Sequence, residues 1–293
     1  MVISWGDPAF ISIELVKDTL DELHDSSKPM RPNPLDQMVL VEQRMLDRSM
    51  PRTPHARTFA LYEVLVDLIE TEFSAVRSAY KLPMPDRSWN VDDYRAVVAQ
   101  DARLKLIDYS LLYHVYTRPE LNLSITTFAD WISVDKRTTE RYRYPAIQRF
   151  TYRLIAAERE ARRTDRQRML LNRLPSSRGR NFVGHDALLE RCKRLLNQAH
   201  PAHLLITGQA GIGKSAFAEA LIRRWVNDQC ISDVIWIDRP QSTASIRELL
   251  SAYLIPEGMQ VELRDVLSRA PQPIVIVCDG CERLLEQESK AID

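Results

Sequence analysis

The sequence predicts an α-helical N-terminal domain followed by an α/β core with a parallel sheet. Glycine is nearly absent from residues 1–178, which hold only Gly6 where average usage predicts about 12, whereas the other seven glycines lie in the last 115 residues. Hydrophobic periodicity changes in the same region, from helical spacing to short apolar strands that alternate with helices. Because glycine supplies the positive φ of turns and binding loops, the two parts must use different backbone geometries.

Composition restricts the class of protein. A chain with 45% hydrophobic and 27% charged residues is ordinary for a globular protein and is not wholly disordered. No apolar run approaches the ~20 residues of a membrane helix, and the first residues lack the basic segment of a signal peptide, so we expect a cytoplasmic protein. Four cysteines are too few for a disulfide scaffold, and Cys278-x-x-Cys281 lacks the second ligand pair of a zinc site. We therefore expect structural thiols.

Residues 1–173 are expected to form the helical domain. Apolar side chains recur at helical spacing in residues 13–23 and 61–73, residues 94–116 form another amphipathic run, and prolines separate these runs. Residues 146–173 continue as an arginine-rich helix, in which the i,i+4 spacing of Glu158 and Arg162 favours a solvated face.

Residues 125–145 resemble a helix-turn-helix. Ala129 is the small residue between the two helices, Ser133 lies at the turn, and residues 136–144 form the second helix. Such a helix fits the major groove of DNA. Pro145 is expected to end the second helix early, and the alternative is a helical hairpin that packs within its own domain. The candidate DNA-binding residues are Lys136, Arg137, Thr138 and Arg141.

Charge is unevenly distributed along a chain of zero net charge. Residues 1–93 carry 16 acidic and 10 basic side chains, net −6, whereas residues 136–194 carry 17 basic and 6 acidic side chains, net +11. A basic central segment can attract nucleic acid or an acidic partner, and a solvated arginine-rich helix accounts for the same charge without a partner. Pro, Ser and Gly in residues 174–181 predict a linker that leads into a second domain at 182–293.

The second domain is expected to be an incomplete α/β core with three recognisable strands at 204–207, 234–238 and 273–279, the last apolar enough to be buried on both faces. Helices are expected at 188–196, 216–226, 246–254 and 261–268. Alternation of strands with helices predicts a parallel sheet.

A phosphate-binding loop lies between the first strand and its helix. Residues 208–215 match G-x-x-x-x-G-K-[ST] in full. Glycines let backbone N–H groups turn toward phosphates, the lysine ammonium reaches the β- and γ-phosphates, and the serine hydroxyl is a ligand for Mg²⁺. The loop residues are Gly208, Gln209, Ala210, Gly211, Ile212, Gly213, Lys214 and Ser215.

Asp279 ends the third strand, where a P-loop protein places the carboxylate that holds magnesium. Glu282 follows three residues later. It is a candidate to orient an attacking water, and the alternative is a carboxylate at the start of a helix. Asp279 is thus the expected metal partner of Ser215.

Three motifs together resemble those of STAND-class signalling ATPases, which are relatives of the AAA+ and NB-ARC proteins. Besides the loop, these motifs are Phe-Val-Gly-His-Asp at 182–186 and Val-Cys-Asp-Gly-Cys-Glu-Arg-Leu-Leu at 277–285. The resemblance covers roughly residues 174–293. It implies ATP or ADP with Mg²⁺ as ligands, Phe182 and Val183 near the adenine, and a nucleotide-driven conformational switch. His185 stands where the family has arginine.

In this family the sheet order is five, one, four, three, two, and strands four and five follow the aspartate strand. We therefore expect a chain truncated after the Walker B aspartate, or one whose missing elements come from self-association or a partner protein. Hydrolysis of ATP by this chain alone is doubtful on this basis. The sequence thus predicts an ATP-binding signalling protein, and the alternative is a DNA-binding or adaptor protein with a vestigial nucleotide domain.

Overall fold

The computed structural model of the chain describes residues 8–24, 33–86, 88–175, 184–198, 204–238, 262–269 and 273–280, with residues 248, 250, 251, 254 and 255. The chain divides into two compact units, Met1–Thr164 and Asp165–Asp293. This division falls within a helix, on the N-terminal side of the expected linker at 174–181. Most of that linker lies outside the described residues, so the domain bounds 1–173 and 182–293 stay predictions.

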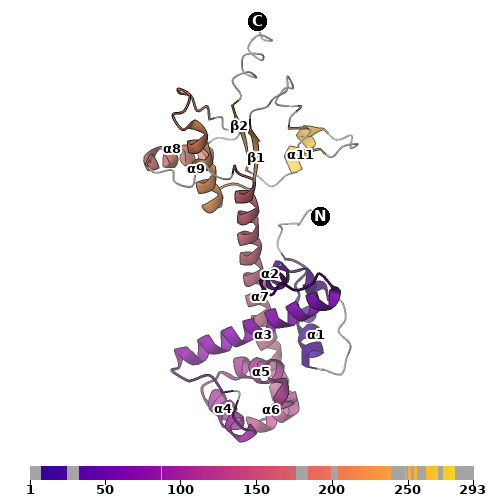
Figure 1. The fold of residues 1–293 in the computed structure, drawn as a ribbon. Coiled ribbons are helices and arrows are strands. Elements are labelled where there is room, and N and C mark those ends of the chain that lie inside the picture. The colour runs from indigo at the N-terminus through magenta and orange to yellow at the C-terminus, as the bar shows by residue number, and fades with distance from the viewer. Residues whose placement is uncertain are drawn as a thin grey trace. The chain divides into compact units, whose positions relative to one another are not determined.

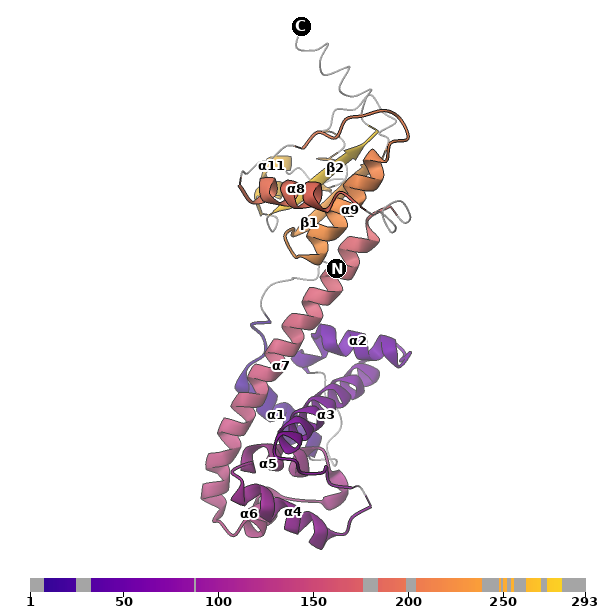
Figure 2. The same cartoon turned by 90° about the vertical axis from the view of Figure 1, so that its left-hand side faces the viewer.

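The described residues of the first unit form helices and short 3-10 turns, in agreement with the helical periodicity of the sequence. Figures 1 and 2 show α4, α5 and α6 grouped together near the beginning of α7. None of the described helices is long and apolar enough to cross a membrane. The elements are α1 (Ile13–His24), η1 (Pro34–Gln37), α2 (Val39–Asp47), α3 (Pro54–Ala79), α4 (Val91–Arg103), α5 (Ile107–Tyr116), η2 (Pro119–Leu121), α6 (Ile125–Trp131) and α7 (Lys136–Asn172).

Local capping residues define where several of these helices begin. The Thr53 hydroxyl accepts a hydrogen bond from the Ala56 N–H before α3, and Pro54 occupies the first turn, where its missing N–H costs nothing. Asn90 and Asp93 form a reciprocal capping box at α4, with bonds of 3.0 and 3.1 Å. These starts are encoded within a few residues of sequence.

The helices of the first unit share one apolar core. Leu20 of α1, Leu65 of α3, Leu111 of α5, Phe128 of α6 and Leu154 of α7 are all fully buried in it. Burial of one such side chain contributes about 1.5–3 kcal/mol, so residues far apart in sequence hold α6 and α7 against the unit.

The expectation that Pro145 ends a helix is wrong. Helix α7 continues from Lys136 to Asn172 with Pro145 inside it. Proline lacks the N–H that would bond to the carbonyl of Arg141, but both residues are exposed, so water can satisfy that carbonyl. The buried side chains of Ala146, Ile147 and Phe150 follow immediately, and their packing offsets the cost of about 3 kcal/mol.

The described residues of the second unit form two parallel strands with helices on both faces. Strand β1 (Asp233–Asp238) pairs in register with β2 (Ile274–Asp279). Figures 1 and 2 show α8 (Asp186–Gln198) and α9 (Lys214–Asn227) on one face of the strands and α11 (Leu263–Arg269) on the other. The last turns of α7 belong to this unit, and Leu170 lies in the same buried apolar cluster as Leu221 and Trp225.

The predicted three-strand core is not found. The segment 204–207 leads into the phosphate loop, but it forms no strand within the described residues, and Leu205 is 73% exposed. No described strand lies beside this segment, because β1 and β2 pair only with each other. A strand without a neighbour has no partner for its backbone groups. Strand β2 is only partly buried, with Ile276 38% exposed, rather than buried on both faces as expected. The expected helix at 246–254 lies largely outside the described residues.

Candidate nucleotide-binding site

The loop at 208–215 has the backbone that its glycines predict. Gly211 has φ +83° and Gly213 has φ +98°, both in the left-handed region that side chains disfavour. Gly213 precedes α9, which begins at Lys214, and its carbonyl accepts the Phe217 N–H at 2.8 Å. The early N–H groups of α9 therefore face the loop with the positive end of the helix dipole, an arrangement that binds anions.

Lys214 closes the loop on itself. Its ammonium donates to the carbonyl oxygens of Gly208 at 2.8 Å and Gln209 at 3.0 Å. A lysine has three donors, and these two acceptors are neutral. An anionic phosphate oxygen is the stronger acceptor, so a nucleotide can replace these bonds without leaving the ammonium unpaired.

Ser215 and Asp279 meet although they are far apart in the sequence. The Ser215 hydroxyl donates to Asp279 Oδ1 at 2.7 Å. Ser215 lies in the first turn of α9, and Asp279 is the last residue of β2. The loop and the end of the strand thus present two oxygen ligands to one point, as the spacing of the two motifs predicts for a magnesium site.

A second carboxylate at this edge was missed in the sequence. Asp238 ends β1 and is the register partner of Asp279. In-register residues of parallel strands project to the same face, about 4.8 Å apart. The signal was present, because both apolar strands end in aspartate, but only the pairing of the strands brings the two residues together.

The donor set suits magnesium rather than a transition metal. Mg²⁺ prefers hard oxygen ligands and keeps several waters, and it is bound through one or two carboxylates with substrate phosphates. Ser215 and Asp279 supply such oxygens. The part of the chain that the structure describes contains no group of three or more His, Cys, Asp or Glu side chains that could hold a metal without a ligand's help.

Three predicted site residues cannot be placed. Phe182 and Val183, the expected neighbours of the adenine, and Glu282, the candidate water-orienting carboxylate, lie outside the described residues. The roles of these three residues stay predictions.

The predicted helix-turn-helix segment forms two helices, α6 and α7, joined by residues 132–135. Ser133 has φ +57° at the turn, and the Val134 N–H donates to the Ala129 carbonyl at 3.1 Å. Arg137 and Arg141 are exposed on α7, whereas the side chain of Lys136 lies outside the described residues. The Thr138 hydroxyl donates to Asp135 at 2.8 Å, so it belongs to the cap of α7. DNA binding by this segment stays a prediction.

Residues 202–292 match the model of the NACHT domain, a family of STAND-class P-loop NTPases; the model is not that of an NB-ARC domain. The matched region begins before the loop and ends after the Asp279 strand, so it covers the geometry described above. No curated protein and no solved structure matches the chain. Residues 202–292 are therefore similar to a nucleotide-binding NTPase with a regulatory role.

Proposed function

We propose that residues 208–215 and Asp279 bind Mg–ATP and that the chain is a nucleotide-dependent regulatory protein. The observation that carries this proposal is the 2.7 Å hydrogen bond between the Ser215 hydroxyl and Asp279, which joins the two motifs at one site. The similarity of residues 202–292 to the NACHT domain supports the same class of function.

Each residue has a specific part in the proposed binding. Lys214 exchanges the carbonyls of Gly208 and Gln209 for oxygens of the β- and γ-phosphates. Ser215 and Asp279 direct their oxygens to one metal position, and the N–H groups at the start of α9 donate to phosphate. The magnesium ion, when bound, neutralises phosphate charge. Phe182 and Val183 are proposed to lie against the adenine.

The switch follows from the same contacts. In the structure, Lys214 is bound to its own loop and Ser215 to Asp279. With nucleotide, all three residues take new partners, so the loop, α9 and the end of β2 respond together. ATP and ADP differ in the γ-phosphate that Lys214 reaches. Hydrolysis requires a group that orients water, and Glu282 is the proposed carboxylate for that role.

Lys214→Ala tests the proposal, with binding to the full chain measured by titration of a fluorescent ATP analogue. A charge-assisted hydrogen bond contributes about 1.5–3 kcal/mol, so we expect an affinity at least about tenfold lower. Lys193→Ala is the matched control, because it removes another lysine of the same unit, one that pairs with Asp228 at 2.7 Å. It should bind ATP as the wild type does.

Two further variants separate metal binding from phosphate binding. Ser215→Ala and Asp279→Asn should retain the affinity measured without magnesium and lose the gain that magnesium provides. Equal ATP affinity in Lys214→Ala, Lys193→Ala and the wild type contradicts the proposal. A wild-type chain that does not bind ATP favours the alternative of a vestigial nucleotide domain.

A further inference from the structure

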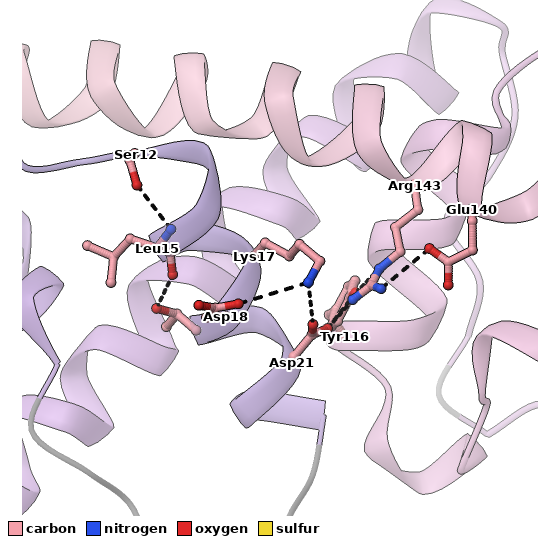
Figure 3. A network of polar contacts seen from close by, with 9 residues as sticks. Ser12, Leu15, Lys17, Asp18, Asp21, Tyr116, Glu140 and Arg143 are labelled. Carbon is pink, nitrogen blue, oxygen red and sulfur yellow. Dashed lines mark hydrogen bonds and ion pairs between the residues drawn. The ribbon is translucent and has the colours of Figure 1, made fainter.

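The positive charge of α7 is largely compensated within its own unit. Of its ten arginines, all but Arg137 and Arg141 have a partner. Figure 3 shows one case, in which the Arg143 guanidinium is directed at Asp21 and Tyr116, with Glu140 beside it. Besides Arg143 and Arg159, five arginines pair with carboxylates and Arg166 donates to the Ser232 carbonyl; the five pairs are Arg149 with Asp108, Arg153 with Glu72, Arg162 with Glu158, Arg163 with Glu160 and Arg168 with Asp165.

Arg137 and Arg141 are the exceptions. Both side chains are exposed, and neither has an ion pair or hydrogen bond with any residue that the structure describes. They are four residues apart, so they lie one helical turn apart on one face of α7. The excess charge of the segment is therefore concentrated in its first two turns.

An exposed tyrosine extends this face. Tyr144 is three residues after Arg141 and is 53% exposed, and Tyr152 is 59% exposed two turns further on. At 3.6 residues per turn, positions 137, 141, 144 and 152 fall on one stripe of the helix. The acidic residues of α7 lie off this stripe: Glu140 pairs with Arg143, Glu158 is buried, and Glu160 and Asp165 pair with arginines.

The packing of α6 and α7 directs the stripe away from the unit. Thr139, Ala146 and Ile147 are buried on the opposite side of α7, and Asp135 caps the helix through the Thr138 N–H at 2.9 Å. The short turn with left-handed Ser133 joins α7 to α6, whose Phe128 is buried in the core. The first turns of α7 are thus held rigidly with their charged face outward, which is the arrangement by which a second helix enters a DNA groove.

We propose that Arg137, Arg141 and Tyr144 form a binding surface for duplex DNA. A helix with its side chains is 10–12 Å across, and the major groove is about 12 Å wide. The two guanidiniums can bond phosphates or guanine edges, and the tyrosine hydroxyl can donate to a phosphate. Arginine clusters also recognise acidic peptides, but here the two arginines lie in the first turns of the second of two helices joined by a short turn, which is the arrangement that enters the major groove, so duplex DNA is the better fit.

Because the other arginines already have partners within the protein, few phosphate contacts are available, and their number sets the salt dependence of the affinity for DNA. The logarithm of affinity falls with the logarithm of salt concentration with a slope of about −0.9 per phosphate contact. Arg137 and Arg141 give about two contacts, hence a slope of about −2. If instead the whole net charge of +11 in residues 136–194 contacted DNA, the slope would be about −10.

Fluorescence anisotropy of a short mixed-sequence duplex, titrated with the full chain between about 50 and 200 mM KCl, tests the proposal. The double variant Arg137→Ala/Arg141→Ala should bind at least tenfold more weakly at low salt, and its slope should approach zero. Arg153→Ala is the matched control, because Arg153 is on the same helix and is 61% exposed but pairs with Glu72 at 2.7 Å. It should bind within about twofold of the wild type.

Several results overturn the proposal. They are a wild-type chain that binds no duplex at low salt, an equal loss in Arg153→Ala and the double variant, or a wild-type slope near −10. Equal binding of single-stranded RNA or heparin with the same residue dependence also overturns it, since duplex DNA is then not the preferred ligand. Lys214→Ala should bind DNA normally, so failure of the nucleotide site and failure of this surface are distinguishable. Thermal unfolding verifies that each variant is folded.

Discussion

Replacement of Glu158 by alanine should destabilise the helical unit strongly, although a charged residue in an arginine-rich helix is expected to face solvent. The Glu158 side chain is fully buried. Its carboxylate accepts the Val39 N–H at 2.9 Å and the Leu40 N–H at 3.1 Å, and it pairs with Arg162 at 2.7 Å. Met38, the residue before α2, provides no side-chain cap. A residue of α7 therefore caps the start of α2.

The magnitude follows from what alanine leaves behind. Two N–H donors at the beginning of α2 lose their acceptor, and each buried unsatisfied group costs about 1–3 kcal/mol. Arg162, whose side chain is 12% exposed, loses the charge that compensates it. Removal of one partner of a buried pair costs about 3–5 kcal/mol, and these effects overlap. We expect a loss of about 3–5 kcal/mol in the free energy of unfolding, a large part of the 5–15 kcal/mol typical of a folded domain.

Thermal and urea unfolding followed by circular dichroism measures this loss. For a unit of this size a change of 1 kcal/mol shifts the midpoint by about 2–4 °C, so we expect a decrease of roughly 10 °C. Glu160→Ala is the control, because Glu160 lies on the same helix but its side chain is 59% exposed in its pair with Arg163. An exposed pair contributes about 0–1 kcal/mol. A loss below 1 kcal/mol in Glu158→Ala, or equal losses in both variants, refutes the capping role.

Two further predictions concern the phosphate loop and a buried histidine. Gly213→Ala places a side chain at φ +98°, and since no atom lies within 4 Å of the new Cβ, its cost is backbone strain of about 1–2 kcal/mol. ATP titration should therefore show an affinity about tenfold lower, and unchanged affinity contradicts this prediction. Burial lowers the pKa of His114 to about 3, below the 6.5 of the exposed residue. Because its protonation favours the unfolded chain, its contribution to stability is complete above about pH 6.5 and is lost as the pH falls toward 3. His114→Phe keeps a ring beside Phe73 and Tyr113 but removes the titrating group. Between pH 6 and pH 4 its free energy of unfolding, measured in urea, should therefore fall by about 2 kcal/mol less than that of the wild type, and equal decreases in the two proteins contradict this prediction.

Short-range features of the sequence predicted the candidate nucleotide site. The loop at 208–215 and the start of α9 depend on residues within one strand–loop–helix segment, where glycine spacing and the lysine–serine pair leave few alternatives. Asp279 was predicted because a strand-ending aspartate is recognisable by position. The parallel pairing of β1 with β2 agrees with the alternation of strands and helices.

Features that depend on distant residues were not predictable in the same way. The strand at 204–207 was expected from its apolar run, but a strand exists only with a neighbour to bond. Pro145 was expected to end a helix, but the tertiary packing of the residues after it continues α7. Asp238 became a candidate only when the register placed it opposite Asp279.

The sequence by itself determined the helical character of the first unit, the phosphate loop and the residues that present it, because these depend on periodicity and on motifs of a few residues. Only the tertiary structure decided which charged side chains are buried, which are paired and which are exposed. The sequence does not distinguish which charged residues of α7 are buried, paired or exposed, yet in the structure Glu158 caps α2, most arginines are paired with carboxylates, and Arg137 and Arg141 are exposed. The physical reason is that a charge is compensated by whatever the fold brings within a few ångströms, and that distance is not encoded in sequence separation.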